Sequence, residues 1–346
     1  MAGLPTEAEL QAVLDYLRGR LGSEIAYRAP PRRLTGGFVT DVYAFELTGA
    51  PPDWSVPLVL RVYPGWADAS LIRRERCAQD TVAAQGFPAP RVLLCEEAAD
   101  AVGRPFMVMD RMPGRPLMGG ADFPTVVVEL PRILRMPART ARVMLDLHAL
   151  DAAALIDCFQ AAGMDRRSAG PDHWLGRCEA LIDEWSLDGL RAPLGWLRAK
   201  RPEDPPRPAI CHGDLWGANI LAEGERITGV LDWNLVTIAD PAFEIGGQLA
   251  SLQQSPIIAP FVIRWIAIAV GRLLARRLRS VYEAAHPLDD SNVRYYAVLR
   301  AFGELTFQLA ADARIRSTGV EERRATWRPA QCARYIRRRT GVRVRI

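Results

Sequence analysis

The chain has 346 residues, of which 49% are hydrophobic and 24% charged, and its mean hydropathy is −0.02. These values exclude a collagen-like, coiled-coil or wholly disordered protein, and the length predicts about two domains. The formal net charge of +4 is unevenly spread, because residues 313–346 carry eleven arginines against two glutamates and the rest of the chain is net negative.

The first 112 residues predict a small domain built on an antiparallel sheet with one prominent helix. A helical pattern covers residues 2–20, and the prominent helix is expected over 67–85, where Gly86 and Pro88 end it. Strand-like or extended runs separated by turn residues occur at 33–38, 42–47, 58–62, 92–95 and 105–110.

After Pro113 the pattern becomes helical, most clearly at 138–150, 174–184 and 293–311. The exception is 208–233, where two short apolar runs flank a turn at Gly224. We therefore predict an α+β protein with a second, mainly helical domain over 113–346. Its basic tail, 313–346, is expected to be a solvated, partly helical terminus rather than a nucleic-acid-binding segment.

The densest group of polar residues lies in segment 210–221, where His212, Asp214 and Asn219 form the pattern H-x-D-x-x-x-x-N. An Asp and an Asn five positions apart on one strand-flanked turn direct oxygen atoms toward a space the size of one ion, and Mg²⁺ prefers such ligands. The alternative is an Asx-turn in which both side chains bond their own backbone.

A second aspartate, Asp232, follows Asp214 by 18 positions. Phosphoryl transfer needs a carboxylate that orients the attacking hydroxyl and two oxygen ligands for Mg²⁺ on the nucleotide phosphates. Asp214 fits the first role, and Asn219 with Asp232 fits the second. The combination favours a functional interpretation over an Asx-turn.

These residues resemble the aminoglycoside phosphotransferase and choline kinase family, which has a protein-kinase-like fold. The resemblance rests on 212–221, on Gly229 to Trp233 and on Ala239 to Glu244, and it extends to Leu147-His148 and to 109–114. It implies a two-lobed fold, a small antiparallel-sheet N-lobe and a large helical C-lobe. It also implies that a nucleotide base bonds the backbone from Asp110 to Met112. Asp240 stands just before Pro241 and is expected to cap the following helix, so we interpret Asp240 and Glu244 as structural, with a place on the substrate side as the alternative for Glu244.

The strand 58–62 departs from the family pattern, because Arg61 stands where kinase-like lobes place a lysine for the nucleotide phosphates. Arginine keeps the charge and adds a planar donor fork. We interpret Arg61 as the phosphate-binding residue, paired with Glu75 from the following helix. The alternative is that both are ordinary surface charges.

The turn between the first two strands contains Gly36 and Gly37. Backbone N–H groups freed by glycine approach phosphate oxygens closely, so this turn is a candidate phosphate cradle. A plain hairpin turn explains the same pair of glycines equally well.

The remaining motifs favour structural interpretations. Six scattered cysteines without a C-x-x-C pair indicate reduced thiols and a cytoplasmic protein. No zinc spacing occurs, and His148 is expected to be a packed core histidine. The apolar run 257–270 is interrupted by Pro260 and Arg264 and is too short to span a membrane.

The sequence thus predicts an Mg²⁺-dependent kinase that transfers a phosphoryl group from ATP or GTP to a hydroxyl of a small molecule. The alternative is a nucleotide-binding pseudokinase or regulatory module without turnover. The acceptor stays open. A polycationic aminoglycoside would suit the acidic residues of the C-lobe, whereas a neutral, hydrophobic or anionic alcohol would suit the apolar run and the basic tail. The acidic residues are Glu244, Glu283, Asp289, Asp290, Glu304 and Asp312.

Overall fold

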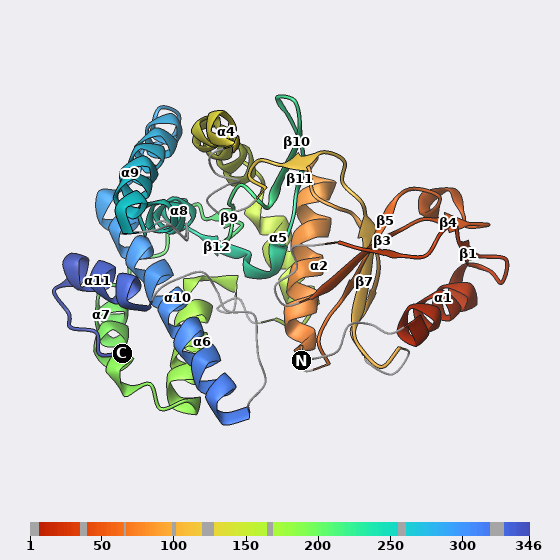
Figure 1. The fold of residues 1–346 in the computed structure, drawn as a ribbon, viewed down its shortest axis with the longest axis horizontal. Coiled ribbons are helices and arrows are strands. Elements are labelled where there is room, and N and C mark those ends of the chain that lie inside the picture. The colour runs from red at the N-terminus through yellow and green to blue at the C-terminus, as the bar shows by residue number, and fades with distance from the viewer. Residues whose placement is uncertain are drawn as a thin grey trace. The chain divides into compact units, whose positions relative to one another are not determined.

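The computed structural model describes residues 7–34, 40–65, 67–98, 102–119, 128–164, 169–254, 261–318 and 329–346. The chain divides into two compact units (Figure 1). The first comprises Met1–Gly114 with Thr228–Asn234, and the second comprises Arg115–Ile227 with Leu235–Ile346.

The first unit contains a five-stranded sheet in which every pair of neighbouring strands runs antiparallel. In sheet order its strands are β2 (Arg32–Arg33), β3 (Asp41–Phe45), β5 (Leu58–Val62), β7 (Phe106–Asp110) and β6 (Val92–Glu96). A separate pair joins β1 (Ala26–Tyr27) to β4 (Leu47–Thr48). The expected strand 58–62 is confirmed at both ends, whereas Gly36 and Gly37 lie outside the described residues.

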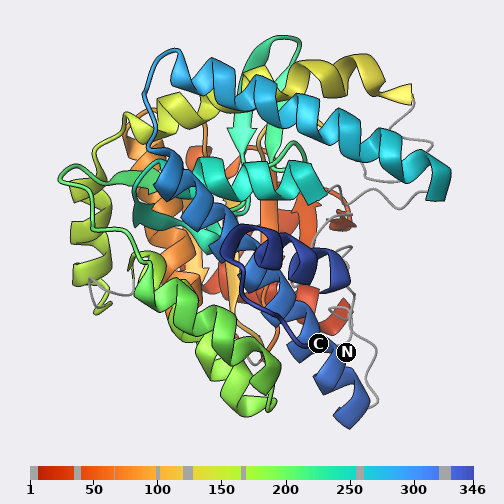
Figure 2. The ribbon, with the colours of Figure 1, turned by 90° about the vertical axis from the view of Figure 1, so that its left-hand side faces the viewer.

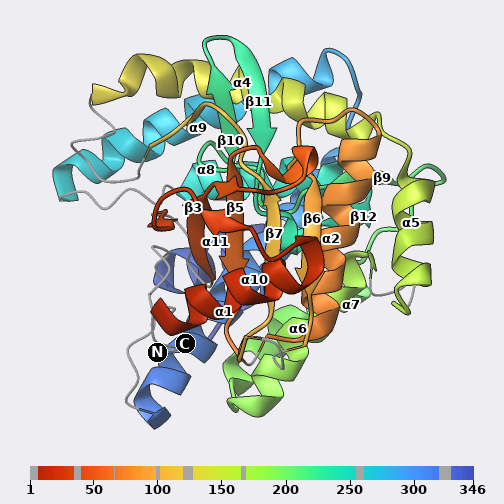
Figure 3. The same cartoon turned by 90° about the vertical axis from the view of Figure 1, so that its right-hand side faces the viewer.

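Side chains alternate between the two faces of this sheet along each strand, and each face is covered by one helix. Helix α1 (Glu7–Leu21) packs its buried leucines against one face, which includes Leu58, Leu60 and Phe106 (Figure 3). Helix α2 (Ala69–Ala84) packs Ile72 against the other face, which includes Met107. Arg61 in β5 and Tyr63 just after it alternate with Leu60 and Val62, so their side chains are on the face that α2 covers.

Helices dominate the second unit (Figure 2). They are α4 (Leu130–His148), α5 (Ala152–Ala161), α6 (Pro171–Glu184), α7 (Arg191–Ala199), α8 (Ala242–Gln254), α9 (Phe261–Glu283), α10 (Asp290–Thr318) and α11 (Pro329–Thr340). Helix α10 is central, with α8, α6, α7 and α11 packed against it, and α4 lies along α9. The basic tail therefore includes folded structure, since α11 buries Cys332, Tyr335 and Ile336.

Short strands frame the loop that carries the H-x-D-x-x-x-x-N pattern. Strand β9 (Ala209–Cys211) pairs with β12 (Thr237–Ala239), and β10 (Ile220–Glu223) pairs with β8 (Arg115–Pro116). Strand β11 (Arg226–Val230) begins in the second unit and ends in the first. The loop thus leaves one strand and enters another within the same unit.

Two expectations need correction. Helix α4 begins at Leu130 rather than at residue 138, because Pro131 lies in its first turn, where no backbone N–H is needed, and the helix accommodates Pro137 in its interior. Four cysteines are free, but Cys77 and Cys158 are disulfide-bonded, so the expectation that all six are reduced is wrong for these two. Sequence spacing gave no sign of this bonding.

Among the described residues, no helix combines the length and the apolar character that a membrane crossing requires.

Candidate active site

Arg61 is the centre of a buried charged cluster in the first unit. Its Nη1 donates to Oε1 of Glu75 at 2.6 Å, and its Nη2 donates to Oδ1 of Asp232 at 2.9 Å. The second oxygen of Glu75 accepts a hydrogen bond of 2.8 Å from the hydroxyl of Tyr63. Burial alone would lower the pKa of Arg61, but the two carboxylates outweigh it and raise the pKa, so the guanidinium stays charged.

Asp232 reaches this cluster because segment 228–234 packs on the first unit. The N–H of Val230 donates to the carbonyl of Pro88 at 2.7 Å, and the fully buried ring of Trp233 meets Phe87 edge to face at 5.9 Å. Asp232 itself has φ of +68°, a left-handed conformation that aspartate adopts at a cost. The surrounding contacts hold it there, which is typical of residues positioned for function.

The second unit holds Asp214 and Asn219 together on the loop between β9 and β10. The amide nitrogen of Asn219 donates to the carbonyl of Asp214 at 2.9 Å and lies 3.5 Å from its carboxylate. The amide oxygen of Asn219 is thereby turned away from these bonds. This bond runs from a side-chain N–H to a carbonyl five residues earlier, so it is not an Asx-turn, and it leaves an oxygen ligand on each side chain.

Glu244, near the start of α8, holds this loop through its backbone. Its buried carboxylate accepts backbone hydrogen bonds from His212 and, at 3.2 Å, from Gly213. Burial raises the pKa of Glu244 to about 7 against the opposing effect of these N–H donors. The interpretation of Glu244 as structural therefore agrees with its contacts.

Asp240 caps the helix that Glu244 belongs to. One of its oxygens accepts the N–H of Ala242 at 2.7 Å, and the other accepts a bond of 2.8 Å from Asn292. The first bond is the N-cap interaction expected for this aspartate. The loop is thus tied through α8 to the start of α10.

Arg300 on α10 fixes the carboxylate of Asp214. Its Nη2 donates to Oδ1 of Asp214 at 2.7 Å, and its Nη1 donates to the carbonyl of Gly213 at 2.7 Å. Glu304, one turn further along α10, lies 2.8 Å from the same Nη2. Oδ1 of Asp214 is thereby occupied, whereas Oδ2 has only the long contact of 3.5 Å with the amide nitrogen of Asn219 and keeps the capacity to accept a proton or a further hydrogen bond.

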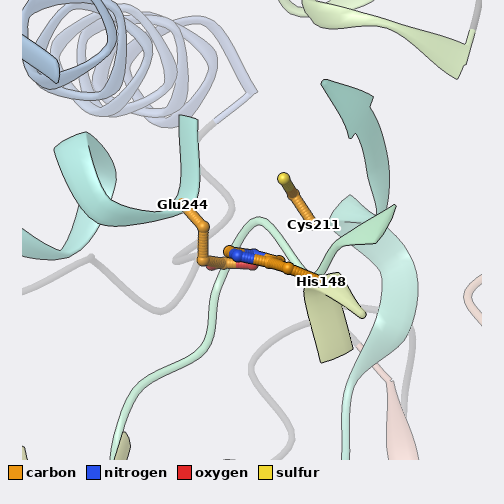
Figure 4. Close-up of side chains that lie close together, drawn as sticks. All are labelled: His148, Cys211 and Glu244. Atoms are coloured by element: carbon orange, nitrogen blue, oxygen red, sulfur yellow. The ribbon is translucent and has the colours of Figure 1, made fainter. Parts of the chain in front are cut away.

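Beneath the loop, His148, Cys211 and Glu244 bring a nitrogen, a sulfur and an oxygen atom within 4.8 Å of one another (Figure 4). This mixed donor set does not suit Mg²⁺, which prefers oxygen ligands. Nδ1 of His148 lies 2.7 Å from the hydroxyl of Tyr282, and burial lowers the pKa of His148 to about 3. The contacts are those of a packed, neutral histidine.

The residues predicted to bond the nucleotide base, Asp110 to Met112, begin at the last residue of β7. The carboxylate of Asp110 accepts a bond of 2.7 Å from Arg91, and the N–H groups of Asp110 and Arg111 donate to the carbonyls of Arg91 and Pro57. Met112 is half-buried. Of the three backbone N–H groups, that of Met112 makes no backbone hydrogen bond among the described residues, so it is available to a ligand.

The structure therefore brings Arg61, Glu75 and Asp232 together in the first unit, and Asp214 with Asn219 in the second. Sequence reasoning missed Tyr63 and Arg300. The alternation along β5 was a signal for Tyr63, since residues 61 and 63 share a face. Nothing local signals Arg300, which lies 86 positions from Asp214.

Comparison with known proteins identifies the family. A model described as "Phosphotransferase enzyme family" matches residues 31–288, which is most of the chain. The chain belongs to this family. The match includes every residue that sequence reasoning placed at the site.

Curated relatives match this phosphotransferase over part of their own length. Acyl-CoA dehydrogenase family member 11 of Rattus norvegicus is 26% identical over 250 residues, which cover 68% of this chain and 30% of the relative. Viomycin phosphotransferase of Streptomyces vinaceus is 30% identical over 187 residues, which cover 48% of this chain and 57% of the relative. The chain thus spans about a third to just over half of these relatives.

Solved structures confirm the expected fold class. A thermostable mutant of aminoglycoside phosphotransferase APH(4)-Ia, in a ternary complex with AMP-PNP and hygromycin B, is similar with a TM-score of 0.62 at 18% identity, covering 96% of this chain and 100% of that one. Macrolide 2'-phosphotransferase type I gives a TM-score of 0.55 at 16% identity, covering 98% of each chain. The phosphotransferase therefore has the α+β, protein-kinase-like fold.

Proposed function

We propose that this phosphotransferase is an Mg²⁺-dependent kinase that transfers the γ-phosphoryl group of ATP or GTP to a hydroxyl of a small molecule. The observation that carries the proposal is the state of Asp214: a carboxylate with one oxygen bonded to a buried arginine, on a loop anchored by Glu244. A carboxylate fixed in this way orients an acceptor hydroxyl and accepts its proton through Oδ2.

On the nucleotide side, Arg61 would neutralise phosphate charge, with Glu75 and Tyr63 fixing its position. The side chain of Arg61 is 13% exposed, and each of its two terminal nitrogens has one hydrogen left after the bonds to Glu75 and Asp232, so these hydrogens are the donors for a phosphate oxygen. The base would bond the backbone N–H of Met112. The complex of a solved structural neighbour with AMP-PNP supports a nucleotide triphosphate as donor.

Each unit by itself offers an oxygen donor of the kind that Mg²⁺ prefers. Asp232 is 37% exposed at its side chain and engages Arg61 through Oδ1, which leaves Oδ2. Asn219 uses its amide nitrogen for Asp214 and keeps its oxygen. When bound by these two residues, Mg²⁺ would neutralise the charge that develops on the phosphates.

The test is Mg²⁺-dependent nucleotide consumption by the purified protein with a panel of hydroxyl compounds: aminoglycosides, macrolides, amino alcohols, hydroxy acids and neutral alcohols. We expect turnover with one class and a loss of at least 100-fold in Asp214→Ala. The matched control is Asp204→Ala, which also removes an aspartate paired with an arginine, Arg201, but on an exposed loop. Turnover that persists in Asp214→Ala would contradict the proposal.

The second candidate is a pseudokinase, and the arginine at position 61 is the observation that favours it. In that case nucleotide binds with the same affinity in the wild type and in Asp214→Ala, and no panel compound is phosphorylated by either protein. Stable nucleotide binding without turnover by the wild type would therefore favour the regulatory module over the kinase.

A further inference from the structure

The exposed hydrophobic side chains of the second unit gather on one pair of helices. Of the six large hydrophobic residues that are exposed in the described part of the chain, five belong to α4, to the position two residues before it, or to α9. The two helices pack against each other, and their first turns lie at the same end of the pair (Figure 2 and Figure 3). A single exposed hydrophobic residue is ordinary, whereas a group of them on neighbouring helices indicates an interaction site. The five residues are Val128, Leu130, Leu134, Ile266 and Leu273.

Helix α9 presents the clearest part of this group. Ile266 and Leu273 are 62% and 57% exposed, and their spacing of seven positions puts them two turns apart on one side of the helix. Ala269 lies between them on that side and is also exposed. On α4, Leu130 and Leu134 are one turn apart and are 40% and 46% exposed. A partner that removes these side chains from water therefore gains free energy from each of them.

Arginines accompany these hydrophobic residues, and carboxylates are scarce. Helix α4 carries four arginines and one carboxylate, and α9 carries five arginines and one carboxylate. The two acidic residues, Asp146 and Glu283, lie in the last turns of their helices, and Glu283 is already paired with Arg279. Five of the arginines are exposed and make no ion pair with any described residue. They are Arg135, Arg142, Arg272, Arg276 and Arg277.

The hydrophobic and cationic groups lie close together on α9. Arg276 and Arg277 follow Leu273 by three and four positions, so they lie beside it one turn further along the helix. Arginine binds phosphate groups through its planar donor fork. An anionic bilayer offers both complements at once, because its headgroup phosphates lie above hydrocarbon. A second copy of the chain in a two-fold contact would instead bring the same unpaired arginines against one another.

We propose that the α4–α9 surface, which consists of the five hydrophobic residues and the five exposed arginines named above, binds an anionic lipid bilayer. Leu134, Ile266 and Leu273 enter the upper acyl region, while the arginines bind headgroup phosphates. The helices lie on the bilayer and do not span it. Neither contribution is large alone, so stable binding requires both the hydrophobic and the cationic residues. This binding is independent of the proposed phosphoryl transfer, because it uses none of the residues that surround Asp214.

The experiment measures binding of the purified full-length chain to sedimenting vesicles of two compositions, phosphatidylcholine alone and phosphatidylcholine mixed with phosphatidylglycerol. We expect the mixed vesicles to bind at least about tenfold more tightly at low salt, and the difference to shrink as salt is added. Wild type that binds neither kind of vesicle, or binds both equally, would overturn the proposal.

The hydrophobic contribution is tested by a substitution with a matched control. Ile266→Asp should weaken binding to the mixed vesicles at least about fivefold, because it places a carboxylate where carbon enters the bilayer. Ile346→Asp makes the same change at a residue that is also 62% exposed but lies outside both helices, and it should leave binding unchanged. Leu273→Asp is a second variant should Ile266→Asp not fold. Equal losses in Ile266→Asp and Ile346→Asp would contradict the role of this surface.

The cationic contribution is tested by removing three charges at once from one helix. The triple variant Arg272→Gln, Arg276→Gln and Arg277→Gln should weaken binding to the mixed vesicles about 100-fold, since each arginine near an anionic bilayer contributes about fivefold. The matched control removes three exposed arginines from α11, so both proteins have the same net charge, and it should lose far less. Equal losses would assign lipid binding to the basic tail and overturn the proposal. The control residues are Arg334, Arg337 and Arg338.

Two further measurements distinguish the bilayer from other partners. Polyglutamate carries negative charge without hydrocarbon, so it should bind more weakly than the mixed vesicles and equally well to the wild type and Ile266→Asp. Tight binding of polyglutamate that Ile266→Asp abolishes would indicate an acidic protein partner. Self-association of the wild type that Ile266→Asp abolishes, measured by sedimentation velocity without lipid, would indicate a second copy of the chain. Either result would overturn the assignment to a bilayer.

Discussion

Nη2 of Arg61 lies 2.9 Å from Oδ1 of Asp232, although 171 positions separate the two residues in the chain. The same guanidinium holds Glu75 of α2. One side chain thus ties strand β5, helix α2 and the segment of Asp232 together. A lysine, with one ammonium group on a flexible stem, would not present two donors in a fixed plane to these carboxylates.

Replacing Arg61 with methionine should therefore be costly. Glu75 is fully buried and the Arg61 side chain is 13% exposed, so Arg61→Met leaves an unpaired carboxylate in the interior, and we expect a loss of about 3–5 kcal/mol in the free energy of unfolding. Nucleotide affinity should fall at least tenfold, because the cation proposed to bind the phosphates is gone. Urea unfolding and nucleotide titration measure the two effects, and Arg61→Lys should be intermediate in both.

The control for this substitution lies on α2, the helix that carries Glu75. Arg76 pairs with Asp80 at 3.5 Å, but their side chains are 52% and 41% exposed. Arg76→Met should therefore cost no more than about 1 kcal/mol and leave nucleotide affinity unchanged. Similar losses in the two variants would show that the buried pair has no special role.

The hydroxyl of Tyr63 is the second support of Glu75. Tyr63→Phe removes the bond of 2.8 Å to Oε2 and leaves that oxygen buried without this donor, so we expect a loss of about 1–3 kcal/mol in thermal or urea unfolding. Tyr295→Phe is the matched control, because its hydroxyl is buried and has no hydrogen-bond partner among the described residues. That variant should be as stable as the wild type or more so, and a loss equal to that of Tyr63→Phe would refute the bond's contribution.

Local patterns predicted much of this molecule. Leu58, Leu60 and Val62 alternate with less buried residues, and the strand they predicted has those bounds in the structure. The spacing of Asp214 and Asn219 placed both on one turn, because five residues of a tight loop leave few alternatives. In both cases the information lies within a few residues of the feature.

Features that depend on distant contacts were not predicted. Arg300 sits on α10 among several other arginines, and its partner on the loop is fixed by the packing of α10 on α8, which no local pattern encodes. Segment 228–234 continues directly from the second unit, yet Trp233 finds its partner on the first. The bonding of Cys77 and Cys158 is missed for the same reason, because tertiary structure, not spacing, determines it.

Gly213 occupies a position that excludes any side chain. It has φ of +82°, and a Cβ there would lie 2.2 Å from the carbonyl oxygen of Leu235. Gly213→Ala must therefore shift the backbone beside Asp214, and we expect a loss of more than about 3 kcal/mol in stability together with loss of turnover. Thermal unfolding followed by circular dichroism measures the first effect.

Gly224 is the control that distinguishes the effect of the steric clash from the effect of the left-handed backbone conformation. It also has a positive φ, +59°, but a Cβ there meets no atom within 4 Å. Gly224→Ala should cost only the left-handed conformation of an alanine, about 1 kcal/mol, and should leave turnover unchanged. If both alanine variants lost the same stability, the contact with Leu235 would not be the reason that position 213 needs glycine.

The carboxyl group of Glu244 predicts a pH dependence of stability. Burial raises its pKa from 4.5 to about 7 in the folded protein, so between these values the folded state binds the proton more tightly than the unfolded chain. The stabilisation from this proton is complete below the unfolded pKa and is lost as pH rises through the folded one. Glu244→Gln does not ionise and keeps an acceptor oxygen for the N–H groups of His212 and Gly213.

The difference in unfolding free energy between the wild type and Glu244→Gln reports on Glu244 alone, because all other titrating groups are common to both proteins. Urea unfolding from about pH 5 to about pH 8 should show wild type losing about 2 kcal/mol relative to Glu244→Gln. Turnover tests whether ionisation matters for catalysis: if the carboxylate form holds the loop of Asp214 more firmly, kcat of Glu244→Gln falls below that of the wild type at high pH, where the variant is the more stable protein. A stability difference that stays constant with pH would show that Glu244 ionises alike in the folded and unfolded protein, and its burial beneath the loop would then carry no penalty.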